Sequence, residues 1–376
     1  MNAPLSHPLL AASERTSGLT SLRSWIDDAD PAWRDIALRA SEPNPFAEDW
    51  FMNASVRHLA VPASARMLTV YEAGQLLGLM PIHIAKTYGR LPVRHVQNWQ
   101  HYNSFLGTPL VRRAFEPIFW ARAFDLLDAD PDAPSFLHVT GLDADGPIAA
   151  ALLQSRKGAS VVHRTSRAML RSGLGPDAYF EQTVRKKKRK EIGRLRARLE
   201  ELGQVRFRKL EAQRDLREWI ETFLALEASG WKGREGAALL IDAATAAFMR
   251  TAMRGAFDSG RLEIVRLDLD GRAIAMLVNF HAHPGSFSFK IAFDEEFARY
   301  SPGVLIQIEN LKILDHVDVD WMDSCAVEGH PMIESLWGER REIVRISVPL
   351  KGWRRRATFS ACRALETASA SLRGLK

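Results

Sequence analysis

The segment 290–311 (KIAFDEEFARYSPGVLIQIENL) carries the residues of this sequence that are best suited to chemistry. A strand ends in a loop, and the loop opens into a helix that begins at Ser301, Pro302 and Gly303. Ser is a favoured N-cap, Pro a favoured first helical residue, and Gly lets another group approach the backbone. The free N–H groups and the helix dipole would bind an anion such as a pyrophosphate. Ser-Pro also begins many helices for structural reasons only, so both interpretations stay open.

Glu227 is the most unusual carboxylate of the sequence. It follows Phe223 and Leu224 by four and three residues, on an otherwise apolar helical stripe. A carboxylate partly buried there is expected to have a raised pKa, which suits a general base. The alternative is a structural carboxylate paired with Lys232, Lys290 or a backbone amide.

Three further polar residues, Asp323, Glu328 and His330, lie beyond a predicted strand end. His330 could act as a base, with Asp323 or Glu328 orienting its ring. Because His330 immediately precedes Pro331, it could instead be the N-cap of a short helix over 331–337.

The end of the strand near residue 293 is flanked by Lys290 and Asp294, which either pair with each other or meet the substrate. Glu328 is counted with them as a substrate-binding residue. Trp231 and Trp337 are expected to form core or pocket walls.

Two other groups of side chains are candidate ligand-binding residues. His281 and His283 alternate on one strand face, but no third metal ligand is evident, so we expect surface histidines and no metal site. The loop 98–110 (NWQHYNSFLGTPL) is rich in aromatic and amide side chains, and its composition suggests the lining of a pocket for a sugar or an amine.

The periodicity of the second half predicts the elements that position these groups. Asp270-Gly271 is a strong two-residue hairpin signal between two apolar strands. In the next strand we expect Phe287, Phe289, Ile291 and Phe293 to share one face, with Ser288 and Lys290 on the other. The order is β-α-α-β-β-β-α-β-α-β, over residues 205–210, 215–231, 242–258, 261–269, 272–280, 286–293, 302–315, 317–323, 331–337 and 341–348.

The first half repeats this organisation without clear sequence identity. A helix with Phe46, Trp50 and Phe51 precedes a hairpin at Ala73-Gly74. We therefore predict an α/β protein with mixed, largely antiparallel sheets in two lobes, 1–175 and 176–350, and a basic tail, 351–376. Further elements of the first lobe are expected at 65–72, 75–85, 92–99, 115–128, 136–140, 146–155 and 160–166.

The formal charge of +6 on 376 residues is unevenly distributed. Residues 181–200 carry nine basic and three acidic side chains, and residues 351–376 carry seven and one, so the rest of the chain is acidic. The stripe Ile192, Leu195, Leu199 and Leu202 makes the first patch an amphipathic helix that is expected to end at Gly203. It is either a solvated helix face or a contact for a phosphate-rich ligand, a nucleic acid or an anionic membrane. Its lack of aromatic side chains disfavours single-stranded nucleic acid.

Composition sets the class of protein. Hydrophobic residues make up 46% of the chain, which excludes a disordered or fibrous protein. Two cysteines, Cys325 and Cys362, cannot build a disulfide framework. No apolar run approaches the roughly 18 residues of a membrane span, and no export signal is apparent. We expect a soluble, cytoplasmic protein.

The strand order, the strand-loop-helix and the segments LEASGWKGREG (226–236) and DSCAVEGHPMIESLW (323–337) together resemble a known family. The chain is similar to the GNAT superfamily of acyl-CoA transferases, in particular the CelD/BcsL-like branch associated with cellulose and exopolysaccharide synthesis. The resemblance covers about 180–345, and the first half only in organisation. Tandem lobes of this kind are also similar to the Fem-type aminoacyl transferases.

The resemblance implies tandem GNAT-like lobes with acetyl-CoA as co-substrate and no metal. Acyl-CoA would lie between the strand ending near Phe293 and the strand ending near Asp323. Backbone N–H groups of the first strand would stabilise the oxyanion. The residues implied for cofactor binding are Ala292, Phe293, Ser301, Pro302, Gly303, Val304 and Leu305.

Two features depart from the family pattern. RYSPGVL (299–305) has one glycine where the family's phosphate loop usually has two small residues. PMIESLW (331–337) lacks the tyrosine that many members use as an acid. Tyr300, solvent or another group would therefore protonate the leaving thiolate.

Three functions stay open. The first is N- or O-acetyl transfer to a sugar, a polysaccharide precursor or an amine. The second is Fem-like transfer from aminoacyl-tRNA, the one case in which a nucleic acid is expected; the helical-hairpin insertion common in those enzymes is not evident. The third is a binding module of an exopolysaccharide-synthesis complex. Residues 185–198 would then contact that machinery or the inner face of the membrane.

Overall fold

The computed structural model describes residues 15–27, 31–230, 239–240 and 242–373. We call β1 to β7 the first half and β8 to β13 the second half. The first half contains, in chain order, β1 (Gly18–Ser21), α1 (Leu22–Asp27), α2 (Pro31–Arg39), η1 (Pro45–Ala47), α3 (Asp49–His58), β2 (Arg66–Glu72), β3 (Gln75–Ala85), β4 (His95–Asn98), β5 (Leu110–Val111), α4 (Glu116–Ala129), β6 (Phe136–Asp143), α5 (Pro147–Ser155) and β7 (Ser160–Leu170).

After the connection, the second half follows the same order of elements as the first half. Two helices link the halves, and one long helix follows the last strand. These elements are α6 (Pro176–Thr183), α7 (Lys186–Glu200), β8 (Val205–Lys209), α8 (Gln213–Ser229), α10 (Ala243–Asp258), β9 (Leu262–Leu269), β10 (Arg272–Ala282), β11 (Gly285–Phe293), η2 (Glu295–Tyr300), α11 (Pro302–Glu309), η3 (Asn310–Asp315), β12 (Trp321–Asp323), α12 (Pro331–Glu334), β13 (Glu339–Pro349) and α13 (Trp353–Arg373).

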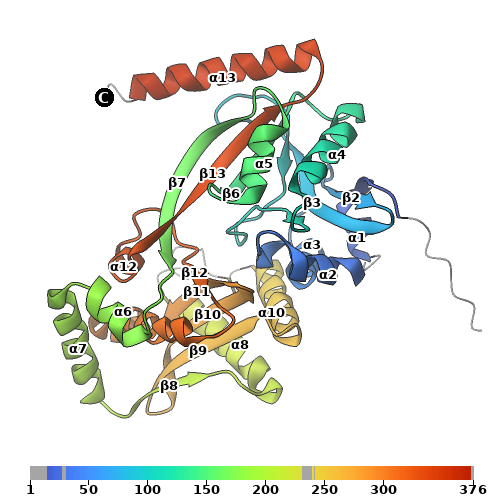
Figure 1. The fold of residues 1–376 in the computed structure, drawn as a ribbon. Helices are drawn as coiled ribbons and strands as arrows, with labels where there is room; N and C mark the ends of the chain where they lie inside the picture. The colour runs from blue at the N-terminus through green and yellow to red at the C-terminus, as the bar shows by residue number, and fades with distance from the viewer. Residues whose placement is uncertain (1–14, 28–30, 231–238, 241, 374–376) are drawn as a thin grey trace, which may run out of the picture.

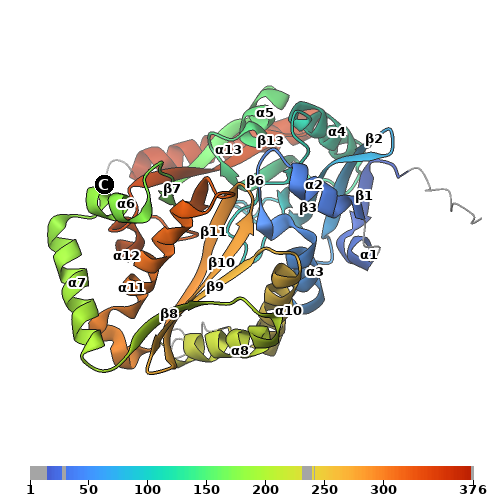
Figure 2. The ribbon, with the colours of Figure 1, turned by 60° about the horizontal axis from the view of Figure 1, so that its bottom comes forward.

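All strands join one mixed sheet in the order β1-β2-β3-β4-β6-β13-β7-β12-β11-β10-β9-β8, with β5 paired to β3. Strand β13, from the second half, pairs antiparallel with β6 and β7 of the first. Strand β7, from the first half, pairs in turn with β12 of the second. Figure 1 shows β7 and β13 running from one half to the other, and Figure 2 shows helices packed along the sheet. The halves therefore exchange their last strands, which joins them through backbone hydrogen bonds.

The predicted hairpins form as expected. Asp270 and Gly271 both have positive φ, at 49° and 83°, as a type I′ turn requires. Ala73 and Gly74 make the same turn in the first half, with φ of 46° and 75°. The two halves therefore share this hairpin turn.

Strand β11 departs from the prediction that four apolar residues share one face. Its pairing with β10 shifts between Val278 and Asn279, which leaves Phe289 as the extra residue of a β-bulge. Phe287 and Phe289 pack in the core under α8 and α10. Ile291 and Phe293 lie instead in the core around α11. The single-face prediction is wrong because a bulge exchanges the faces of the strand beyond it.

Some elements differ from their predicted bounds, and others were not predicted. The helix expected over 302–315 is α11 followed by the 3₁₀ turn η3, and the one over 331–337 shortens to α12. The first half also contains β1, α1 and α2, and the basic tail forms α13. Phe359 and Cys362 dock α13 against Tyr88 and Phe136 of the first half. Within the described residues, no helix has the length and apolar character needed to cross a membrane.

Candidate functional site

The second half contains a pair of parallel strands that part. Residues 285–287 of β11 pair with residues 321–323 of β12. Strand β12 ends there, whereas β11 continues through its bulge to Phe293. Two parallel strands that diverge at their carboxyl ends open the sheet at the point where α/β proteins commonly bind ligands.

The helix α11 begins beside the far end of β11. Ser301, its N-cap, has a left-handed backbone (φ 52°), and its side chain makes no capping bond. Gly303 is buried, and a Cβ atom there would lie 3.4 Å from Cδ1 of Phe293 and 3.7 Å from Sδ of Met332. The residues implied for cofactor binding on β11 and on α11 therefore adjoin each other.

Glu227 belongs to α8 and lies next to the far end of β11. Its side chain is 3% exposed, and Oε2 accepts a hydrogen bond of 2.8 Å from the backbone N–H of Leu239. Together with Ile291, Ala292 and Phe293 it lines a small cavity of about 20 Å³. This bond is the one expected of the alternative, a structural carboxylate paired with a backbone amide. The carboxylate also lies beside the strand expected to hold the acyl group. Trp231 and Lys232 lie outside the described residues.

Lys290 projects from the bulge of β11 toward the first half. Its Nζ lies 5.8, 5.6 and 5.4 Å from the ring centroids of Tyr102, Phe105 and Phe289. The aromatic loop that contains Tyr102 and Phe105 thus meets the second half at Lys290. Asp294 is engaged elsewhere: Arg272 donates to its carboxylate, and so does the N–H of Glu296, at 3.0 Å.

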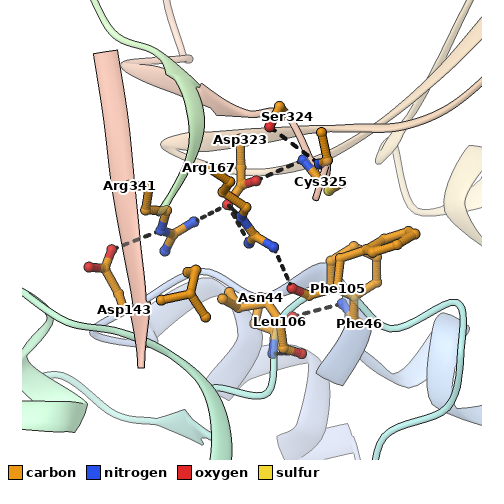
Figure 3. A network of polar contacts seen from close by, with 12 residues as sticks. Asn44, Phe46, Phe105, Leu106, Asp143, Arg167, Asp323, Ser324, Cys325 and Arg341 are labelled. Atoms are coloured by element: carbon orange, nitrogen blue, oxygen red, sulfur yellow. Dashed lines mark hydrogen bonds and ion pairs between the residues drawn. The ribbon is translucent and has the colours of Figure 1, made fainter. Parts of the chain in front are cut away.

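Asp323, at the end of β12, is fully buried in an ionic network (Figure 3). Its Oδ2 accepts from Nη2 of Arg167 at 2.6 Å and from Nη1 of Arg341 at 2.8 Å. Its Oδ1 accepts from the backbone N–H of Cys325 at 2.8 Å. Arg341 also donates to Asp143 at 2.9 Å. The network therefore joins β12 to β7, β13 and β6, which come from both halves.

Asp323 was expected to orient the ring of His330, and this environment also makes it unsuited to act as a base itself. Burial opposes its ionisation, but Arg167 and Arg341 outweigh burial and hold its pKa below the usual range. A carboxylate with a lowered pKa is a poor proton acceptor. We therefore assign Asp323 to positioning: Arg167 also donates to the carbonyl of Phe105 at 2.8 Å, which fixes the aromatic loop.

The predicted pairing of His330 with a neighbouring acid is wrong. Asp323 is held by two arginines, and Glu328 is exposed and accepts from the N–H of Ser166 at 3.3 Å. His330 occupies the N-cap position of α12, yet its side chain makes no capping bond. Its Nδ1 is buried and has no hydrogen-bond partner in the described part of the chain.

The remaining predicted residues are largely buried. Tyr300 is 7% exposed, with the guanidinium of Arg299 4.8 Å from its ring centroid. Trp337 is 1% exposed in the same core cluster, as expected for a wall residue.

Three histidine rings cluster at the end of β10: His281 on the strand, His283 just after it, and His316. His281 and His283 stack at 5.9 Å between ring centroids, and His316 stacks at 5.9 Å from His281. His283 is exposed as predicted, but His281 is buried. Burial lowers the pKa of His281 to about 4. Across the described ranges, no group of three or more His, Cys, Asp or Glu residues is arranged to hold a metal ion.

A known protein family matches the segment that contains β11 and β12. Residues 186–339 match the family model described as an acetyltransferase (GNAT) domain. This segment contains β8 to β12, α11 and the site around Glu227. The match supports an enzyme of the GNAT-domain acyltransferase superfamily, and the mixed α/β sheet has the predicted fold class. No curated protein matches the chain in sequence.

Solved structures share the fold of nearly the whole chain. The crystal structure of FemX is 11% identical, with a TM-score of 0.55 over 83% of this chain and 94% of that one. A conserved protein of unknown function from Bacteroides thetaiotaomicron is 11% identical, with a TM-score of 0.54 over 87% and 97%. L-PGS from Bacillus licheniformis is 11% identical, with a TM-score of 0.52 over 86% and 93%. At these identities the likeness is one of fold.

The sequence alone did not reveal Arg167, Arg341 and Asp143 as parts of the site. They lie on three strands that are adjacent only in the folded sheet. The one available signal was an arginine within an otherwise apolar strand end, as in RAML (167–170).

Proposed function

We propose that the protein is an acyltransferase that uses acetyl-CoA, bound where β11 and β12 part. The observation that carries the proposal is the end of their pairing at residues 287 and 323, beyond which β11 runs on alone to Phe293 beside the start of α11. The acyl thioester would lie along β11, and the pyrophosphate against the first N–H groups of α11. The acceptor we propose is a sugar, a polysaccharide precursor or an amine.

The chemistry proposed for Glu227 is general base catalysis. The acceptor nitrogen or oxygen gives a proton to the carboxylate and forms a bond to the thioester carbon. Backbone N–H groups of β11 stabilise the oxyanion, and the carbon–sulfur bond then breaks. The thiolate takes a proton from solvent or from Tyr300.

Calorimetric titration with acetyl-CoA tests donor binding. The parent protein and Gly303→Ala should both bind, because a Cβ at this position meets neighbours at ordinary contact distances of 3.4 Å or more. Gly303→Glu places a carboxylate at the proposed pyrophosphate site and should abolish binding. Failure of the parent protein to bind would remove acetyl-CoA as the donor.

Release of free CoA thiol, measured with an acceptor amine or sugar, tests the base. Glu227→Gln keeps an oxygen to accept the Leu239 bond but cannot take a proton, so kcat should fall by about 10²- to 10⁴-fold. Acetyl-CoA affinity should not change. A kcat within threefold of the parent would contradict the assignment of Glu227.

A second candidate, Fem-like transfer from aminoacyl-tRNA, is favoured by the basic helix α7. Lys188 and Arg196 of this helix pair with Glu191 and Glu200, but six exposed cations on α7 and at its N-cap make no ion pair with any described residue. The chain also shares its fold with FemX. The same surface would serve an anionic membrane or the polysaccharide-synthesis machinery, at the cytoplasmic face. These exposed basic residues are Arg185, Lys186, Lys187, Lys190, Arg194 and Arg198.

Gel shifts with tRNA and sedimentation with phosphatidylserine vesicles separate these partners. Both are run at 50 and 200 mM salt, since phosphate contacts weaken steeply with ionic strength. Changing Lys186, Lys187 and Lys190 to Glu should abolish whichever binding occurs, with the paired Arg196→Glu as a control. Binding of tRNA but not of acetyl-CoA would favour the Fem-like function.

A further inference from the structure

A cavity of about 870 Å³ lies where the two halves meet. The first half contributes Glu42 and Asp143 to its lining, and the second half contributes Trp321 and Arg341. Arg341 also bonds Asp323, at the end of β12 where the parallel strands separate. The cavity therefore adjoins the ionic network that leads to the proposed transfer site.

The carboxyl group of Glu42 is fixed in this lining by its neighbours. Its Oε1 accepts a 2.8 Å hydrogen bond from the N–H of Ile148, in the first turn of α5. A Cβ atom at residue 146 would overlap this carboxylate, so Gly146 leaves the room that Glu42 occupies. Glu42 is 7% exposed, and its Oε2 is buried with no hydrogen-bond partner among the described residues. A buried polar oxygen without a partner is rare and costly.

Besides the ion pair of Asp143 with Arg341, the lining of this cavity carries exposed charges of both signs. Arg113 and Arg171 are exposed on the lining and form no ion pair within the described part of the chain. The same holds for Asp318 and Asp320, on the wall contributed by the second half. Unpaired charges of opposite sign in one cavity suit a ligand that carries both signs itself.

We propose that this cavity binds a zwitterionic ligand, an amino acid or the end of a peptide, whose ammonium group meets Glu42 and whose carboxylate meets Arg113 and Arg171. Asp318 and Asp320 add to the attraction for the ammonium group. As a binding site the assignment stands on the cavity alone. As the acceptor site for acyl transfer it rests on the proposed function.

The ionisation of Glu42 provides a signature of binding. Burial, followed by the charge of Asp143, raises its pKa to about 7, while the Ile148 N–H and Arg341 act in the opposite direction; Glu116 on α4 also raises it. An ammonium ligand favours the ionised form, so affinity should rise about tenfold from pH 6 to pH 8 as the ionised fraction grows. At pH 7 binding should release a fraction of a proton.

The probes are L-lysine, 1,5-diaminopentane and glutarate, titrated calorimetrically into the full-length protein at pH 6, 7 and 8. L-lysine should bind at least tenfold more tightly than the diamine or glutarate, because it alone joins both charges. Two buffers of different ionisation enthalpy report the proton released at pH 7. The absence of saturable binding of L-lysine at roughly 10 mM would overturn the proposal.

Substitutions test whether the Glu42 carboxyl group binds the ammonium group of the ligand. Glu42→Gln retains an acceptor for the Ile148 bond and should weaken L-lysine about 10- to 100-fold and abolish the pH dependence. Gly146→Ala, which displaces the carboxyl group, should weaken it similarly. Glu116→Gln, a nearby buried acid outside the cavity lining, is the matched control and should change affinity less than threefold at pH 8. Unchanged affinity and pH dependence in Glu42→Gln would overturn the proposal.

The proposed contact of the ligand's carboxylate with Arg113 and Arg171 is tested separately. The double variant Arg113→Gln, Arg171→Gln should lose glutarate and weaken L-lysine, while the diamine keeps its affinity; equal losses for all three probes would contradict the assigned orientation. Acetyl-CoA is titrated into the same preparations. Binding of acetyl-CoA without L-lysine would remove this site and leave acyl transfer standing, and the reverse result would do the opposite.

Discussion

The two halves contain the same pair of parallel strands but differ in what lies beyond the pairing. In the first half, β4 pairs with β6 at residues 96–97 and 137–138. The side chain of Asn98 then bridges the gap: its Nδ2 donates to the carbonyl of Thr140 at 2.9 Å, and its Oδ1 accepts from the N–H of Thr140, also at 2.9 Å. Gly107 fills the remaining space by donating to the carbonyl of Gly141.

In the second half, the corresponding strands stay apart. β12 ends at Asp323, and the bulge of β11 turns Lys290 toward the aromatic loop. One amide side chain and one glycine thus separate a sealed sheet from a parted one. The comparison teaches that a repeated fold keeps its strand order while a few side chains decide which copy has room for a ligand.

The largest expected effect comes from breaking the network that joins the halves. Asp323→Ala leaves Arg167 and Arg341 buried without their shared partner, so the free energy of unfolding should fall by about 3–5 kcal/mol. Urea denaturation at pH 7 measures it. Asp315→Ala, on the exposed surface, should change stability by less than about 0.5 kcal/mol. A similarly small effect for Asp323→Ala would show that the network does not hold the halves together.

The buried acids of the two halves should respond oppositely to pH. Burial raises the pKa of Glu42 to about 7 from 4.5, so its stabilising contribution is full below pH 4.5 and is lost as pH rises through 7. Relative to Glu42→Gln, the parent protein should lose about 3 kcal/mol between pH 4.5 and pH 8. Asp323, with a lowered pKa, stabilises above about pH 4 and loses its contribution in acid.

Urea denaturation across this pH range measures the difference between the two proteins. Glu48 also has a pKa raised by burial to about 7, but it is present in both and cancels. Parallel stability curves for the parent protein and Glu42→Gln would contradict the assigned titration.

A matched pair of glycine substitutions tests the sealed gap against the parted one. In Gly107→Ala the new Cβ would overlap the carbonyl oxygen of Thr140, so stability should fall by about 1–3 kcal/mol. In Gly303→Ala the Cβ meets Phe293 at 3.4 Å, and the change should stay below about 1 kcal/mol. Denaturation midpoints of the two variants give the comparison. Equal midpoints would remove the distinction between the halves.

The smallest expected effect concerns α13, which packs on the first half. Tyr88 Oη lies 3.0 Å from Oγ of Ser347 and donates to Glu366 of α13 at 2.9 Å. Tyr88→Phe should therefore cost about 1 kcal/mol of unfolding free energy. Tyr102→Phe, at an 86% exposed side chain, is the control and should cost nothing measurable. Identical stabilities of the two variants would mean that these bonds do not dock the helix.

Much of the fold was predictable because local patterns decided it. Both hairpins followed from two-residue turn signals, and the repeated order of elements followed from apolar periodicity. The face of β11 was not predictable, because a bulge depends on register against β10. The helix in the basic tail was missed because its apolar contacts, Phe359 and Cys362, find partners only on the first half.

The candidate site was predictable only in part. Glu227, the strand end and the start of α11 were recognised because each stands out locally, and the structure places them side by side. Glu42 gave no local signal, since its partners are Ile148 and Gly146, about a hundred residues away. Trp231 was also singled out, and it lies outside the described residues.

The sequence by itself determined the order of elements, the turns and the helix start that could hold an anion, because these depend on neighbours within a few residues. The tertiary structure alone decided the exchange of β7 and β13, the burial of Asp323 between two arginines and the sealing of one gap by Asn98. The physical reason is that charge pairing and burial depend on which strands become adjacent. Strand adjacency is a property of the whole sheet.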